Sequence, residues 1–244
     1  MNTVAIIQAR MSSSRLPGKI LMELAGKPML LNILERVSRA KKIDKIVVAT
    51  SNEQTDDEVE SFLKKHDYNC FRGNLNNVLD RFYHCAKKYD SNIVVRLTAD
   101  NALVDPGIID EAIDVFRKEN VDYLYYKASL PLGMCIEVFS FDALEKAYSE
   151  ATNLECLEHV TPYIRNNTHL FKVLNYKNAA EENHSGLRFT MDTKEDFEFV
   201  SNIYNQFSSN DFSYKDVMGV LSSHPDWVMI NANVKQNTLF YNGE

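Results

Sequence analysis

The segment 6–21 (IIQARMSSSRLPGKIL) combines features of a site that binds a small anion. An apolar run is followed by three cations within ten positions, Arg10, Arg15 and Lys19, with small residues between them. No Asp or Glu precedes Glu23, although the 244-residue chain carries a formal net charge of -7. Backbone N–H groups and cationic side chains are the groups that bind phosphate oxygens. The segment therefore predicts a triphosphate-binding loop, with a solvated basic turn as the alternative.

The loop matches neither of two common glycine-rich phosphate motifs. It lacks the Gly-Lys-Ser or Gly-Lys-Thr of a Walker loop, and Gly18 stands alone where a dinucleotide fingerprint has three glycines. The cations themselves suit the chemistry, because Arg15 could fork two phosphate oxygens and Lys19 could follow charge onto a bridging oxygen.

Two aspartates follow strand-like segments further along the chain. Asp100 stands just past the run 92–98, where a carboxylate is a natural ligand for Mg²⁺ beside phosphate oxygens and water. A turn aspartate that bonds its own backbone is the alternative. Asp192 follows the run 187–191, and with Glu195 it also fits a helix cap.

Further polar residues lie in the second half of the chain. Glu137 stands alone in the apolar run CIEVF, where burial without a partner is costly, so it faces either solvent or a site. His159, Tyr163 and Arg165 form a polar cluster near one helix end, for which a surface helix is the alternative.

Strands and helices alternate along the first 120 residues. We predict strands over 4–8, 45–50, 68–71 and 92–98, and helices over 28–40, around Val59 and over 78–89. A further helix begins at Asp105-Pro106, with Asp as the cap and Pro in the first position. This alternation predicts a mostly parallel sheet flanked by helices. The loop and Asp100 then share the carboxyl edge of the sheet, where such folds bind ligands.

The pattern is less regular after about residue 120. We predict strands over 121–126, 135–139, 171–175 and 187–191, helices over 141–150 and 155–166, and mainly helical structure elsewhere, including 226–237. No repeat or linker interrupts the chain, so we expect one domain over 1–244 whose second half carries a substrate-side insertion.

Composition narrows the class of protein. Hydrophobic residues make up 45% and charged residues 25%, which is ordinary for a globular protein. The acidic balance argues against nucleic acid as a partner, because phosphate backbones recruit dense Lys/Arg surfaces. The four cysteines form no CxxC pair and are expected to be buried, reduced thiols. No signal peptide or bilayer-spanning stretch is apparent, so we expect a cytoplasmic enzyme without a membrane partner.

The opening loop closely resembles the N-terminal signature of the cytidylyltransferases that activate acidic sugars, such as the acylneuraminate and 3-deoxy-manno-octulosonate cytidylyltransferases. The similarity continues in order through AGKPML, KIVVATS, FRGNLNNVLDRF, VRLTADNALVDP, EVFSFDALEKA, EHVTPYIRNN and RFTMDTKEDF. It covers nearly the whole chain and is greatest to the subgroup named for spore coat polysaccharide biosynthesis protein F. It implies the nucleotide-diphospho-sugar transferase fold, a mixed, mostly parallel sheet in a three-layer α/β/α sandwich.

The resemblance also implies roles for named residues. The CTP triphosphate would be wrapped by Arg10, Ser12, Arg15 and Lys19. Catalysis would rest on Arg15, Lys19 and Asp100. Mg²⁺ would be held by Asp100 and Asp192. The candidates for base and ribose contacts are Arg72, Asn77, Asp80 and Arg81.

Contacts to cytosine and to the acceptor are less closely defined. Cytosine needs an acceptor for its exocyclic amine, such as a backbone carbonyl near Ala9 or in the loop 72–77. The acceptor-binding candidates are Glu137, His159, Tyr163 and Arg165. The resemblance assigns nucleotide binding to about residues 1–120, and acceptor binding and dimerisation to about residues 121–244. Members of the family are commonly homodimers.

The implied reaction is attack of an acceptor oxygen on the α-phosphorus of CTP with release of pyrophosphate. A small anionic acceptor such as a sugar acid would yield a CMP-sugar, and a phosphorylated or phosphonate acceptor a CDP-type product. A glycosyltransferase is an alternative of another class, but its D-x-D is missing because Asn101 and Ala102 follow Asp100. A nucleotide-binding homologue without catalysis is a third.

The chain departs from its relatives mainly around the acceptor. Relatives usually have T-G-D-C-P where this chain has TADNA over 98–102, which keeps Asp100. They often have P-D-G where this chain has PLG over 131–133, and R-E-H-V-T where it has LEHVT over 157–161. An acid and a base are therefore missing from the acceptor half, and the identity of the acceptor stays open.

Overall fold

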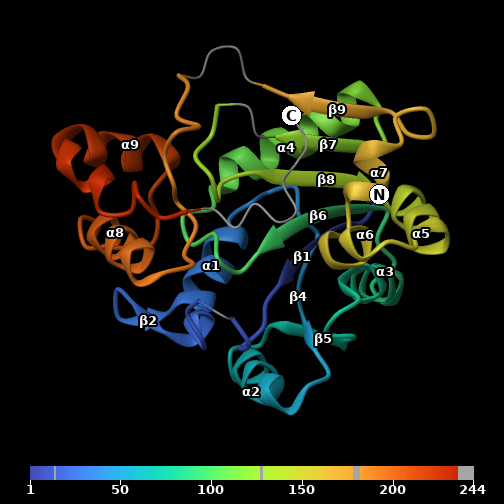
Figure 1. Ribbon diagram of the computed structural model, residues 1–244, viewed down its shortest axis with the longest axis horizontal. Coiled ribbons are helices and arrows are strands. Elements are labelled where there is room, and N and C mark those ends of the chain that lie inside the picture. The colour runs from blue at the N-terminus through green and yellow to red at the C-terminus, as the bar shows by residue number, and fades with distance from the viewer. Residues whose placement is uncertain (14, 127–128, 178–181, 236–244) are drawn as a thin grey trace.

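The architecture is a central sheet with helices on both faces (Figure 1). The computed structural model describes residues 1–13, 15–126, 129–177 and 182–235. Within them the sheet has seven strands in the order β5-β4-β1-β6-β8-β7-β9. Their bounds are β1 (Thr3–Gln8), β4 (Lys45–Ser51), β5 (Asn69–Gly73), β6 (Ile93–Thr98), β7 (Tyr123–Tyr126), β8 (Ile136–Ser140) and β9 (Val173–Tyr176).

The sheet is parallel except at β8. Strands β5, β4, β1 and β6 pair in parallel, whereas β8 runs antiparallel to both β6 and β7. A separate antiparallel pair, β2 (Glu23–Leu24) and β3 (Lys27–Pro28), precedes the first helix. The predicted mixed, mostly parallel sheet is confirmed.

The side chains of each strand alternate between two hydrophobic cores. In β1, Ala5 and Ile7 belong to one core and Val4 and Ile6 to the other, as the two-residue period of a strand requires. The first core is covered by α1 (Met29–Val37), α2 (Asp57–Lys65), α4 (Pro106–Glu119), α8 (Lys194–Tyr204) and α9 (Tyr214–Ser223). The second is covered by α3 (Val78–Lys88), α5 (Phe141–Glu150), α6 (Leu154–His159) and α7 (Pro162–Asn166).

The parallel strands bring the predicted chemistry to one edge. Gln8, at the end of β1, is in register with Ala49 of β4 and Thr98 of β6. The loop after β1 and Asp100 after β6 therefore lie at the same carboxyl edge, as predicted. Asp105 also caps α4 as predicted, with Oδ1 accepting the N–H of Gly107 at 2.7 Å.

Three predictions for the second half are wrong. Segment 187–191 forms no strand but an extended segment with one isolated bridge, between Leu132 and Arg188. The predicted helix 155–166 is two helices, interrupted where Val160 has φ +70°. Over 226–237, the short 3-10 helix η3 (Pro225–Met229) is followed by turns, and residues 236–237 lie outside the described part of the chain.

The cap of α8 also differs from the expectation by one residue. Thr193 accepts the N–H of Asp196, and the Asp196 side chain accepts the N–H of Thr193 in return. Asp192 and Glu195 are therefore not the capping pair, which leaves the Asp192 carboxylate available for other contacts.

The structure also shows the state of the cysteines and the length of the apolar helices. The four cysteines are free thiols, with Cys85 and Cys156 buried and Cys70 and Cys135 half-buried. Among the described residues no helix is both long and apolar enough to cross a bilayer.

Gly133 lets the chain before β8 approach the segment that precedes Asp192. It has φ +101°, and a Cβ there would lie 2.5 Å from the backbone nitrogen of Thr190. We expect Gly133→Ala to lower the free energy of unfolding by about 3 kcal/mol, combining backbone strain with a backbone clash. Gly26→Ala, at φ +80° with no atom within 4 Å, isolates the strain and should cost about 1 kcal/mol. Urea unfolding of both variants checks this, and equal losses would contradict it.

Candidate active site

A buried aspartate anchors the start of the loop after β1. Asp56, in the short 3-10 helix η2 (Gln54–Asp56), accepts the N–H of Met11 at 2.8 Å and the N–H of Ser51 at 3.0 Å. The Ser51 hydroxyl also donates to it. Burial alone would raise the pKa of Asp56, but these hydrogen bonds outweigh it and hold the pKa below its usual value. The loop is thus fastened to the end of β4.

The loop then turns back on itself before Lys19. The Met11 carbonyl accepts the N–H of Ser13 at 2.9 Å and of Gly18 at 3.0 Å. Gly18 has φ +70°, a conformation that glycine adopts without strain. The 3-10 helix η1 (Lys19–Leu21) follows, so the turn aims Lys19 inward, where it is largely buried.

Lys19 joins the loop to two aspartates that are far away in the sequence. Its Nζ donates to Asp192 Oδ1 at 2.9 Å and to the Met191 carbonyl at 2.7 Å. The same nitrogen lies 3.7 Å from Asp100 Oδ2. The Thr98 hydroxyl donates to the other oxygen of Asp100. The two predicted metal ligands therefore flank one ammonium group.

Two guanidinium groups contact the second oxygen of Asp192. Arg15 lies 2.7 Å from Oδ2, and Arg188 donates to the same atom at 3.0 Å. Burial alone would raise the pKa of Asp192, but Lys19, Arg15 and Arg188 outweigh it and keep the pKa below its usual value. Asp192 is thus ionised and paired with three cations.

These side chains border a polar cavity of about 220 Å³. Its lining comprises Gln8, Ala9, Arg10, Ser13, Arg15, Lys19, Ile20, Thr98, Ala99, Asp100 and Asp192. Six of the predicted site residues meet here, whereas Ser12 is exposed outside the lining and residue 14 lies outside the described residues. The lining contains the cations that suit a triphosphate and the carboxylates that suit a metal ion.

The residues predicted to contact base and ribose are not part of this cavity's lining and are held by protein contacts. Arg72 donates to Asp57 at 2.6 Å and to Glu60 at 2.9 Å, both in α2. Asn77 caps α3 by accepting the N–H of Asp80 at 2.9 Å. Their contacts to nucleotide stay predictions.

Arg81 of the same segment is almost completely buried. It donates to the Asn74 carbonyl. Burial, with the nearby Arg10, lowers its pKa to about 10. A Cβ on Gly73 would lie 2.9 Å from the Arg81 side chain, so that side chain packs directly against the end of β5. Contact of Arg81 with the base or ribose stays a prediction.

Glu137 is buried behind the cavity. Arg96, Tyr123 and Thr161 all donate to it, the last two at 2.6 Å. Burial alone would raise its pKa, but the Arg96 guanidinium and these hydroxyls hold the pKa below its usual value. Arg96 also donates to Gln8 at 3.1 Å, and Gln8 lines the cavity. A chain of hydrogen bonds therefore connects Glu137 with the cavity.

The other acceptor-binding candidates lie on α6 and α7, on either side of Thr161, which donates to Glu137. His159 ends α6, half-buried, and burial lowers its pKa. Arg165 is half-buried in α7. The Tyr163 hydroxyl donates to Glu150 at the end of α5. Contacts of these side chains with an acceptor stay predictions.

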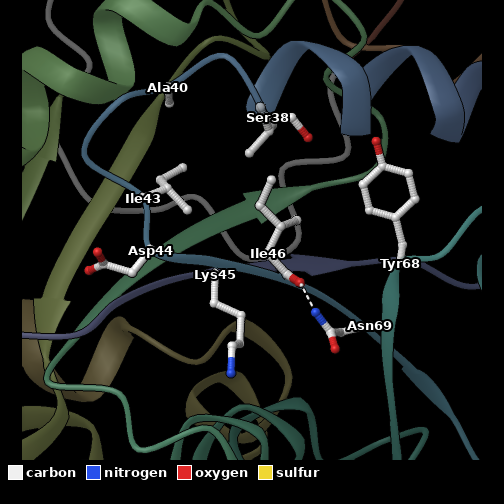
Figure 2. Close-up of a pocket in the computed structure, with 9 residues that line it drawn as sticks. Ser38, Ala40, Ile43, Asp44, Lys45, Ile46, Tyr68 and Asn69 are labelled. Atoms are coloured by element: carbon white, nitrogen blue, oxygen red, sulfur yellow. Dashed lines mark hydrogen bonds between the residues drawn. The ribbon is translucent and has the colours of Figure 1, made fainter.

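A second cavity, of about 380 Å³, opens at the opposite edge of the sheet, before β4 and β5 (Figure 2). Its lining includes Val37, Ala40, Ile43 and Ile46. The Asn69 amide donates to the Ile46 carbonyl at 3.1 Å, the bond dashed in Figure 2. Its charged lining residues are one aspartate and one lysine, Asp44 and Lys45, in contrast with the three cations and two carboxylates that line the cavity at the carboxyl edge.

Asp56 and Arg188 are site residues that sequence patterns did not single out. Asp56 sits in a polar segment with several acids, and nothing nearby shows that its partner is Met11, 45 positions earlier. Arg188 stands four residues before Asp192 in a segment that forms neither a regular strand nor a helix, so no periodic pattern indicated their contact. The only available signal was the similarity of the segment RFTMDTKEDF to relatives.

A cationic loop and two carboxylates at the carboxyl edge of an α/β sheet define a protein that handles a phosphorylated nucleotide. Comparison with known proteins agrees with this class. Residues 4–244 match the family model described as "Cytidylyltransferase", and the chain belongs to that family. It is therefore a nucleotidyltransferase, of the kind that transfers a cytidylyl group from CTP.

Individual relatives match over different lengths. The spore coat polysaccharide biosynthesis protein SpsF of Bacillus subtilis is 36% identical over 91% of this chain and 94% of its own. A 3-deoxy-manno-octulosonate cytidylyltransferase of Geobacter sulfurreducens is 36% identical over 46% of this chain and 44% of its own. The solved structure of a cytidylyltransferase from Leptospira borgpetersenii has a TM-score of 0.89 at 35% identity, covering 97% of this chain and 99% of that one. The nucleotide-diphospho-sugar transferase fold is thereby confirmed.

The Asp56 anchor predicts a pH dependence of stability. We expect Asp56→Asn to lower the free energy of unfolding by about 2 kcal/mol at neutral pH, because an amide replaces a buried acceptor of three hydrogen bonds. The folded-state pKa lies below the unfolded value, so this stabilisation is complete above about pH 4 and is lost as pH falls through the folded pKa.

The check is urea unfolding of wild type and Asp56→Asn between pH 3 and 7. The difference in free energy of unfolding between the two proteins should become smaller as the pH is lowered. Asp67→Asn is the control, because Asp67 shows none of these bonds to the loop. A gap that stays constant across this range would contradict the assigned charge state.

Proposed function

We propose that this enzyme couples CTP to a sugar acid and forms a CMP-sugar for surface polysaccharide or glycoconjugate synthesis. An acceptor oxygen attacks the α-phosphorus, a new O–P bond forms, and the bond to the β-phosphate oxygen breaks to release pyrophosphate. The observation that carries this proposal is the convergence of Lys19 and Arg15 with Asp100 and Asp192 on one cavity beside the loop.

Arg15 and Lys19 are the groups that receive the charge of the leaving pyrophosphate. Both line the cavity, where Lys19 donates to the Asp192 carboxylate and Arg15 forms an ion pair with it. A triphosphate carries more charge than one carboxylate, so it draws these donors toward its own oxygens. The backbone turn at Met11 and Gly18 keeps Lys19 aimed at the cavity throughout. Positioned cations of this kind are the main contribution that proteins make to transfer at phosphorus.

The two aspartates fit a magnesium ion. Asp100 and Asp192 are hard oxygen donors on either side of one ammonium group, and the Met191 carbonyl lies beside them. When bound, magnesium supplies positive charge beside the reacting phosphate. Thr98 fixes the orientation of Asp100 by donating to its other oxygen.

The acceptor is proposed to bind on the side of the Arg96–Glu137 pair. This pair is joined to the cavity through Gln8. We assign acceptor contacts to the predicted residues around it, Glu137, His159, Tyr163 and Arg165. The Geobacter relative is named for a sugar acid, and SpsF is named for polysaccharide biosynthesis. We also propose that the enzyme acts as a homodimer in the cytoplasm.

Two substitutions test the nucleotide half of this proposal. We expect Lys19→Ala and Asp100→Asn each to lower kcat for pyrophosphate release about a hundredfold, because each removes one electrostatic contact of the transition state. Lys27→Ala is the matched control, since Lys27 pairs with Glu35 away from the cavity and should leave the rate unchanged. Near-normal rates in either site variant would overturn the assignment.

An acceptor screen tests the other half. Pyrophosphate formation is measured with each of the four nucleoside triphosphates, Mg²⁺, and a panel of sugar acids, sugar phosphates and phosphonates. We expect turnover with CTP and a sugar acid. Turnover only with phosphorylated or phosphonate acceptors would replace the CMP-sugar by a CDP-type product. Sugar transfer from a nucleotide-sugar, without pyrophosphate formation, would favour a glycosyltransferase.

A further inference from the structure

The three cations around Asp192 have different access to the cavity. Arg15 and Lys19 line it, and the Arg15 side chain is 35% exposed. Arg188 is outside that lining, with a side chain only 8% exposed. It approaches Asp192 from within the protein, so two of the three partners face an entering nucleotide and the third lies behind the carboxylate.

Arg188 is fixed in this position by a second carboxylate. Its Nε donates to Asp196 Oδ1 at 2.8 Å, and its Nη2 donates to Asp196 Oδ2 at 3.0 Å and to Asp192 Oδ2 at 3.0 Å. Asp196 is fully buried, and it also accepts the N–H of Asp192 and the Asn231 amide, at 3.0 and 2.9 Å. One guanidinium thus bridges two carboxylates four residues apart at the start of α8.

We propose that Arg188 is a positioning residue that stays paired with Asp192 while Arg15 and Lys19 exchange their ion pairs with Asp192 for contacts with the triphosphate. This inference rests on the proposed function above and deepens it. Arg188 then remains as the counter-ion of Asp192 after Arg15 and Lys19 have moved to the nucleotide.

The electrostatics of a narrow cavity require such a counter-ion. Once Arg15 and Lys19 turn to phosphate oxygens and before magnesium binds, the Asp192 carboxylate faces a polyanion at short range. Like charges at this separation repel strongly where little water screens them. Arg188 neutralises Asp192 from behind and cannot be drawn away, because Asp196 holds it by a two-pronged hydrogen bond. Without Arg188, Asp192 would both repel the nucleotide and compete for its cations.

The test measures CTP affinity by titration calorimetry in metal-free buffer with a chelator, which separates it from turnover and from magnesium. We expect Arg188→Gln to raise the Kd for CTP about tenfold, because an uncompensated Asp192 retains Arg15 and Lys19. Asp192→Asn removes the competing charge. The double variant should therefore bind CTP within about twofold of Asp192→Asn alone.

Matched variants separate positioning from general damage. Arg188→Lys keeps the charge but cannot bridge both carboxylates, so its Kd should fall between wild type and Arg188→Gln. Arg39→Gln removes another partly buried arginine, which contacts Asn210 and Asp211 remote from the cavity, and should bind CTP like wild type. Circular dichroism establishes that each variant is folded. If Arg188→Gln does not fold, Arg188→Lys with and without Asp192→Asn decides the same question.

Each outcome has a defined meaning. Wild-type affinity in Arg188→Gln, or a double variant as weak as Arg188→Gln, would overturn the inference, since a purely structural role predicts no rescue. If wild type itself fails to bind CTP, the proposed function fails first. If wild type binds CTP and Arg188→Gln binds it with the same Kd, this inference is rejected and the proposed function is not.

Discussion

The ion pair between Lys19 and Asp192 is the contact on which the site depends. It joins residues 173 positions apart, one after the first strand and the other before α8. Neither charge could be buried to this extent alone, because an isolated ammonium or carboxylate loses several kcal/mol of hydration in a protein interior. The loop, the end of β6 and the segment before α8 must therefore fold together before the cavity exists. Its polar lining and the charge state of Asp192 follow from that convergence.

Local sequence patterns correctly predicted the elements that depend on neighbouring residues. The helical period over 78–89 and the cap at Asp105 depend on neighbouring residues, and both are correct to within a residue or so. The carboxyl-edge position of the basic loop followed from strand–helix alternation alone. Segment 187–191 was mistaken for a strand because an extended chain with alternating side chains has the same pattern whether it pairs along its length or only through Leu132.

The candidate site was predictable where its chemistry lies in the residue type itself. Three cations in an acid-free loop and an aspartate after a strand indicate a phosphate and metal site without any structure. Asp56 and Arg188 act through groups on other segments, and no spacing rule encodes a contact from Asp56 to the Met11 N–H. The capping error at Asp192 has a local origin, because Thr193 and Asp196 have the same spacing one position later and form the capping box themselves.

The antiparallel strand β8 links two parts of the site through one neighbouring strand. It places Glu137 opposite Arg96 on β6, the strand that ends at Thr98 beside Asp100. Arg96, which pairs with Glu137, and Thr98, which donates to Asp100, thus belong to one continuous strand. A displacement of β6 therefore moves both groups together. Side chains on α6 and α7 can change without moving the sheet, so under the proposed acceptor assignment those two short helices are the adaptable part of the protein.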